Sequence, residues 1–149
     1  MKNGIPTLLV AEDDENDFLF LGLAFSKANV QIELRRVSNG DEAIEYLAGE
    51  NHFADRTAHP LPRMIILDLK MPSADGFDVL VWLRDQESLK NLPAVVLSNS
   101  DYPGDIEQAR ALGAKAYLVK PLACDGYATV VQAVLDLWNS ASDGGSPSD

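Results

Sequence analysis

Short apolar runs alternate with amphipathic stretches along most of the chain. The runs are aliphatic and bounded by Gly, Pro, Asn or Asp, which is typical of buried strands, whereas the stretches between them repeat apolar residues at helical spacing. The pattern predicts strands over residues 7–11, 32–37, 64–67, 94–97 and 114–119. It predicts helices over 16–28, 41–47 and 77–84, one ending at 113, and one over 124–138. A polar loop over 49–62 separates the second helix from the third strand.

Five strand–helix units in succession indicate an α/β fold with a five-stranded parallel sheet, doubly wound by helices on both faces. Parallel strands need crossover connections, and those crossovers are right-handed. We expect one domain over residues 1–138, followed by a disordered tail over 139–149 that is built from Ser, Gly, Asp and Pro. In such sheets the functional crevice lies beyond the carboxyl ends of the strands.

Polar side chains follow four of the five predicted strands. Each taken alone has an ordinary interpretation: Asp14 and Asp17, for example, stand where carboxylates cap the start of a helix. Their joint occurrence at successive strand ends points instead to one site. The residues at these ends are Glu12, Asp13 and Asp14; Asp68; Ser98; and Lys120.

This mixture of carboxylates, a hydroxyl and an ammonium suits phosphoryl transfer. Two carboxylates about 4 Å apart repel by roughly 4 kcal/mol at an effective dielectric near 20, so a cluster of them must protonate, separate or bind a cation. Mg²⁺ prefers such oxygen ligands. A carboxylate can itself be the nucleophile that forms an aspartyl phosphate, with Ser98 and Lys120 neutralising the phosphoryl oxygens.

The same residues carry a family resemblance that spans residues 6–138. The chain resembles the receiver domains of two-component response regulators, which implies a flavodoxin-like (βα)5 receiver fold. The segments that carry the resemblance are Leu8–Asp14, Leu67–Gly76, Val96–Ser98 and Tyr117–Pro121.

The resemblance implies that Asp68 accepts a phosphoryl group in a Mg²⁺-dependent reaction. Glu12, Asp13 and Asp68 would hold the metal, together with the backbone carbonyl of Lys70. Glu12 stands where the family more often has Asp, and its longer side chain would reach the metal through water. The role implied is a phosphoacceptor for signalling, which phosphorylates and dephosphorylates itself, and not an enzyme that acts on other substrates.

The resemblance also implies the residues that respond to the phosphoryl group. Ser98, which replaces the commoner Thr, and Lys120 would contact it. Tyr117 would move inward when Ser98 is drawn toward the phosphoryl group, and so carry the change to the surface. A cis peptide bond is expected between Lys120 and Pro121.

A narrower likeness points to the partner. The long loop through His52, Phe53 and Pro60, the run Ser98–Asp101 and the late Trp138 look most like small stand-alone regulators that are paired with phytochrome-type histidine kinases. The resemblance therefore implies a sensor histidine kinase of the phytochrome type as the phosphodonor.

Three alternative functions fit the residues less well. A haloacid-dehalogenase-type phosphatase needs a second Asp two residues after its nucleophile, where this chain has Lys70. A flavodoxin-like FMN binder needs a hydroxyl- and Gly-rich loop after the first strand, and the Glu12–Asp14 cluster would repel the phosphate. A receiver-like binding module that works without phosphorylation is disfavoured because no member of the constellation is missing.

Composition limits the compartment and the partners. The net charge of −11 disfavours direct binding to nucleic acid. The longest apolar runs span only a few residues, too few to cross a membrane, and the first residues do not resemble a secretory signal. A single cysteine, Cys124, excludes an internal disulfide. We therefore expect a cytoplasmic protein.

The last predicted helix is apolar around most of its circumference. Packing on a sheet uses only about a third of a helix surface, so the excess suggests a second buried face. A homodimer through this helix would cover it. The alternative is that Trp138 folds back onto its own domain. The residues predicted to form the dimer interface are Tyr127, Val131, Val134 and Trp138.

Overall fold

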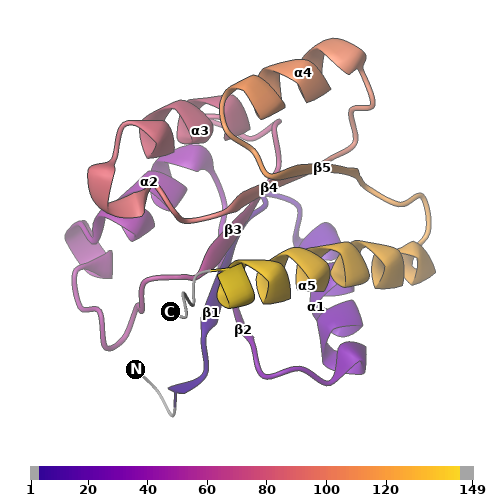
Figure 1. Ribbon diagram of the computed structural model, residues 1–149, viewed down its shortest axis with the longest axis horizontal. Coiled ribbons are helices and arrows are strands. Elements are labelled where there is room, and N and C mark those ends of the chain that lie inside the picture. The colour runs from indigo at the N-terminus through magenta and orange to yellow at the C-terminus, as the bar shows by residue number, and fades with distance from the viewer. Residues whose placement is uncertain (1–3, 145–149) are drawn as a thin grey trace.

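The computed structural model describes residues 4–144 and contains one parallel sheet flanked by helices (Figure 1). The strands are β1 (Thr7–Ala11), β2 (Glu33–Val37), β3 (Met64–Leu67), β4 (Ala94–Ser98) and β5 (Ala116–Val119). The main helices are α1 (Glu15–Ala28), α2 (Gly40–Ala48), α3 (Gly76–Arg84), α4 (Pro103–Ala111) and α5 (Tyr127–Gly144). Three short 3₁₀ turns, η2 (Asn51–Phe53), η3 (Glu87–Leu89) and η4 (Cys124–Gly126), lie in the connections.

The strand order is β2-β1-β3-β4-β5, and every pairing is parallel. This confirms the predicted fold class. Residues alternate between the two faces of each strand, so that Leu8 and Val10 of β1 face α1 and α5, whereas Leu9 and Ala11 face α2 and α3. The sheet therefore lies between two apolar layers, with α1 and α5 side by side on one face (Figure 1).

The central strands are buried along their whole length, as expected for strands covered on both faces. Ala11 of β1 pairs with Leu67 of β3 and with Val37 of β2, so these three strands end at the same level of the sheet. The residues that follow β1 and β3 are thereby brought to one edge. No helix within residues 4–144 combines the length and the apolar character needed to cross a bilayer.

The last helix differs from the prediction at both ends. The chain makes a single 3₁₀ turn over Cys124–Gly126, and α5 itself runs from Tyr127 to Gly144. Residue 139 is therefore too early as the predicted start of a disordered tail, because the helical backbone of α5 continues through residue 144. Residues 145–149 lie outside the described residues.

Tyr127, Val131, Val134 and Trp138 are all buried within the chain's own core, so their predicted role as a dimer interface is wrong. The helix covers the sheet and α1 at once, and this uses more of its surface than a single contact would. Trp138 folds back onto its own domain, with the Arg63 guanidinium 4.8 Å from its ring centroid. A homodimer remains a prediction, and along α5 it would have to use exposed side chains such as Gln132 and Asp136.

Candidate phosphoacceptor and metal site

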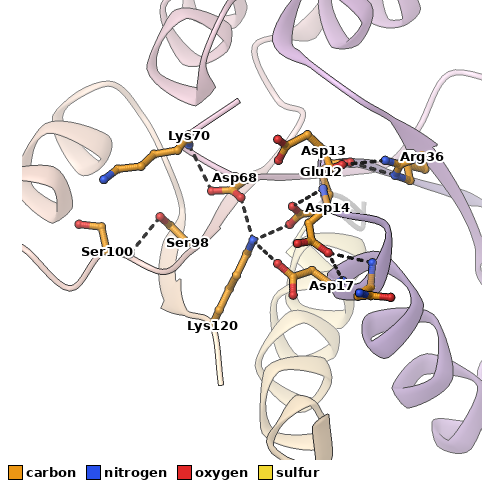
Figure 2. A network of polar contacts seen from close by, with 11 residues as sticks. Glu12, Asp13, Asp14, Asp17, Arg36, Asp68, Lys70, Ser98, Ser100 and Lys120 are labelled. Atoms are coloured by element: carbon orange, nitrogen blue, oxygen red, sulfur yellow. Dashed lines mark hydrogen bonds and ion pairs between the residues drawn. The ribbon is translucent and has the colours of Figure 1, made fainter. Parts of the chain in front are cut away.

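The candidate site lies at the carboxyl ends of β1, β3, β4 and β5 (Figure 2). Backbone hydrogen bonds hold these ends together: the Asp68 N–H donates to the Ala11 carbonyl at 3.1 Å, and the Lys120 N–H donates to the Ser98 carbonyl at 2.8 Å. The side chains surround a crevice of about 280 Å³. The residues that line it are Glu12, Asp13, Asp14, Asp17, Asp68, Lys70, Ser98, Asn99 and Lys120.

Lys120 is the central cation of this site. Its Nζ lies 2.7 Å from an oxygen of Asp17, 2.8 Å from Asp68 and 2.9 Å from Glu12, and the side chain is only 3% exposed. Burial alone would lower the pKa of Lys120, but the hydrogen bonds to Asp17, Asp68 and Glu12 outweigh it, so the pKa is raised above its ordinary value. Figure 2 shows the ammonium between the three carboxylates.

Glu12 is buried beside other negative charge. Burial raises its pKa to about 7, the charge of Asp68 adds to the rise, and the hydrogen bond from Lys120 opposes it. The carboxylate also accepts the Asp14 N–H at 3.1 Å. A second cation beside Glu12 would favour its charged form, as expected of a metal ligand.

Glu12, Asp13 and Asp68 each place a carboxylate oxygen within 4.8 Å of the others. Glu12 and Asp68 are buried, whereas Asp13 is exposed at the mouth of the crevice. One ion can therefore contact all three residues and still keep water on its open side. Hard oxygen ligands with room for water suit Mg²⁺, so the donor set fits this metal.

Asp68 is held at both of its carboxylate oxygens. Its Oδ2 accepts from Lys120 Nζ at 2.8 Å, and its Oδ1 accepts the backbone N–H of Lys70 at 3.2 Å. Lys70 thus lies beside the cluster, and the ligand role of its carbonyl stays a prediction. The fixed carboxylate lines the crevice, so a phosphoryl donor that enters it would meet a nucleophile in a defined position.

Ser98 and Tyr117 are both hydrogen-bonded to the backbone of Ser100, in the loop that follows β4. Ser98 is buried, and its hydroxyl accepts the Ser100 N–H at 3.2 Å. The Tyr117 hydroxyl donates to the Ser100 carbonyl at 2.7 Å, while its ring is half-buried. Ser100 therefore bridges the two residues predicted to act as the switch. A change at Ser98 has a direct hydrogen-bonded route to Tyr117.

Two residues that the sequence did not assign to the site, Asp17 and Arg36, also contact it. Asp17, for which helix capping was an ordinary alternative, instead bonds Lys120. Arg36 at the end of β2 donates to the backbone carbonyls of Glu12 at 2.9 Å and Asp13 at 3.1 Å. The sequence places Arg36 near the end of a predicted strand, which is a weak indication of a site residue. Only the strand order, with β2 next to β1, brings its side chain to Glu12 and Asp13.

The expected cis bond before Pro121 is wrong: none of the peptide bonds among the described residues is cis. The trans form is the ordinary preference of an X–Pro bond. The Lys120 side chain reaches all three carboxylates with its following peptide bond in that form.

The chain matches known signalling proteins over most of its length. Residues 8–132 match the response regulator receiver domain. Similar solved structures include response regulator RPA3017 in red light signalling of R. palustris, with 39% identity over 89% of this chain and 93% of that one at a TM-score of 0.83. The phosphorylated cyanobacterial phytochrome response regulator RcpA shares 30% identity over 91% and 94% of the two chains at a TM-score of 0.82.

A curated relative adds to this likeness. The polar-differentiation response regulator DivK of Brucella ovis is 29% identical over 87% of this chain and 95% of its own length. The match to the receiver domain covers well over half of the chain. With its parallel five-stranded sheet and the acidic cluster at the strand ends, this chain belongs to the response regulator receiver family, whose general role is signalling by phosphorylation.

Proposed function

We propose that this protein accepts a phosphoryl group on Asp68 from a sensor histidine kinase and signals through changed contacts with other proteins. The observation that carries the proposal is the Asp68 carboxylate, which is fixed at 2.8 Å from Lys120 Nζ beside Glu12 and Asp13. A carboxylate oxygen of Asp68 forms a bond to phosphorus as the bond between phosphorus and the donor's leaving group breaks.

Mg²⁺ would be held by Glu12, Asp13 and Asp68, with the Lys70 carbonyl as a further ligand. When bound, it neutralises charge on the phosphoryl oxygens during transfer. Lys120 and Ser98 line the same crevice and add a positive charge and a hydroxyl donor. Tyr117 would carry the change outward through Ser100, to which it is hydrogen-bonded.

The partner follows from the chemistry and from the relatives. A phosphohistidine is the donor that receiver domains use, and two similar structures are regulators of red-light or phytochrome signalling. We therefore include a phytochrome-type kinase in the proposal. We also propose a cytoplasmic location and no activity on other substrates, in keeping with the family role in phosphorylation signalling. The net charge of −11 supports the absence of direct nucleic-acid binding.

Intact mass spectrometry after incubation with acetyl phosphate tests the proposal. The wild type should gain one phosphoryl adduct in the presence of Mg²⁺, and no adduct with a chelator. Asp68→Asn should gain none under either condition. A folded wild-type protein that binds Mg²⁺ and gains no adduct would instead support a receiver-like binding module that works without phosphorylation.

A further inference from the structure

We propose that Asp17 is a positioning residue that holds Lys120 in the resting state and competes with the incoming phosphoryl group for its ammonium. The inference rests on the proposed function, because the competition exists only if Asp68 is phosphorylated. It concerns a carboxylate that stands outside the candidate metal cluster of Glu12, Asp13 and Asp68.

The contact itself is close and specific. Asp17 Oδ2 accepts from Lys120 Nζ at 2.7 Å, compared with 2.8 Å for Asp68 and 2.9 Å for Glu12. An ammonium has three N–H donors, so these three carboxylates can use all of them. A phosphoryl oxygen that binds Lys120 must therefore displace one of the present partners.

Asp17 does not make the helix-capping contact that the equivalent residue of α3 makes. Both α1 and α3 begin with the pattern Asp-x-x-Asp. In α3 the Asp75 and Asp78 side chains complete a reciprocal capping box, in which Asp78 accepts the Asp75 N–H at 3.0 Å. In α1 the Asp14 N–H bonds Glu12 instead, and the carboxylate of Asp17 turns to Lys120.

Asp17 is also the partner that Lys120 can release at the lowest cost. Its side chain is 25% exposed, whereas those of Glu12 and Asp68 are 5% and 7% exposed. Water can solvate the carboxylate of Asp17 when the lysine leaves, but a deeply buried carboxylate would lose its counterion without that compensation. Asp17 thus restrains Lys120 at rest and yields it to the phosphoryl group.

The test is the initial rate of Asp68 phosphorylation by acetyl phosphate at saturating Mg²⁺, followed by intact mass. Asp17→Asn should react faster than the wild type, by roughly fivefold, which is the upper range for a partly exposed ion pair. Asp17→Glu keeps the charge and should stay near the wild-type rate. Glu15→Gln removes the same charge from the same turn of α1, at an exposed side chain, and should change the rate by less than about twofold.

Fluoroberyllate, an analogue of the bound phosphoryl group, gives a second readout. Its dissociation constant should fall in Asp17→Asn and stay near the wild-type value in Asp17→Glu and Glu15→Gln. If Asp17→Asn does not fold, Asp17→Ser serves as the uncharged variant.

A rate and a fluoroberyllate affinity for the uncharged variant at or below those of a reactive wild type would overturn the role of Asp17 and leave the proposed function intact. So would an equal gain in Glu15→Gln, because the effect would then be one of general charge. A wild type that is never phosphorylated would overturn both proposals.

Discussion

At the scale of single residues, one buried ammonium balances several carboxylates. Lys120 contacts Glu12, Asp17 and Asp68, and the pKa of Glu12 is raised by its burial and, in addition, by the charge of Asp68. A divalent cation at the cluster would share Glu12 and Asp68 with the lysine. Lys120 and the metal are therefore expected to compete for the same oxygens.

Replacing Lys120 with Met tests this competition. Without divalent ions the variant should lose about 3 kcal/mol of unfolding free energy, because buried carboxylates are left without their counterion. Its Mg²⁺ affinity should rise by roughly tenfold, since the competing charge is gone. Isothermal titration calorimetry and urea unfolding measure the two effects. Lys70→Met, at an exposed lysine lining the same crevice, is the matched control, and an unchanged Mg²⁺ affinity in Lys120→Met would contradict the competition.

Ionisation of Tyr127 should lower the unfolding free energy at alkaline pH. Burial and the nearby charge of Asp17 raise its pKa to about 12 from its ordinary value of 10. The folded state thus favours the protonated hydroxyl, so the contribution to stability is complete below pH 10 and is lost as the pH rises from 10 to 12. In Tyr127→Phe the unfolding free energy should fall less steeply over this range, by up to about 1.4 kcal/mol per pH unit.

Urea unfolding followed by circular dichroism at several values between pH 9 and 11 measures that slope. Tyr102→Phe is the control, because Tyr102 is mostly exposed. Parallel slopes for the wild type and Tyr127→Phe would show that Tyr127 has no part in the alkaline loss.

At the scale of elements, the strands could be predicted from the sequence and the coverage of α5 could not. Runs such as Met64–Leu67 are buried on both faces, so their composition alone marks them. The strand-end rule then places Asp68 and Lys120 at one edge. An apolar helix such as α5 does not reveal whether its own domain or a partner covers it, because both bury the same side chains.

A substitution at Trp138 tests whether α5 packs against its own domain or against a partner. Trp138→Ala should lower the unfolding free energy by about 3 to 5 kcal/mol, since it empties a buried position next to the sheet and removes the stacking on Arg63. Denaturant unfolding at two protein concentrations measures this loss, which should not depend on concentration. Leu122→Ala, at a fully exposed leucine, should change stability little. A loss that appears only at high protein concentration would support an interface instead.

Gly76, the first residue of α3, packs closely against the backbone that follows β3. A Cβ at this position would lie 2.5 Å from the Asp68 carbonyl oxygen and 2.9 Å from the Leu69 Cα. Gly76→Ala should therefore cost about 1 to 3 kcal/mol and slow phosphorylation by shifting Asp68. Gly22→Ala in α1, where a Cβ has open space, should stabilise the protein by roughly 0.5 to 1 kcal/mol. Thermal unfolding compares the two, and a stable, fully reactive Gly76→Ala would contradict the close packing.

At the scale of the whole molecule, the net charge of −11 and the acidic cluster couple folding to cations. The sequence could predict the cluster because three of the strand ends carry carboxylates or a lysine. It could not predict the contributions of Asp17 and Arg36, since one depends on a rotamer and the other on which strand lies next to β1.

Mg²⁺ should stabilise the folded protein as a whole. At ten times its dissociation constant, the unfolding free energy should rise by about 1.4 kcal/mol relative to NaCl at the same ionic strength, because only the folded chain assembles the cluster. Asp13→Asn should remove this gain, while Asp101→Asn, which also removes one exposed carboxylate, should keep it. An equal gain in both variants would mean that Mg²⁺ acts through general screening alone.

The most direct test of the central claim is to identify the phosphorylated residue itself. Borohydride reduces an aspartyl phosphate to homoserine, and peptide mass spectrometry then locates the changed position. After reaction with acetyl phosphate and Mg²⁺, we predict homoserine at position 68. Homoserine at another acidic residue of the crevice, or at none, would contradict the assignment of Asp68 as the phosphoacceptor.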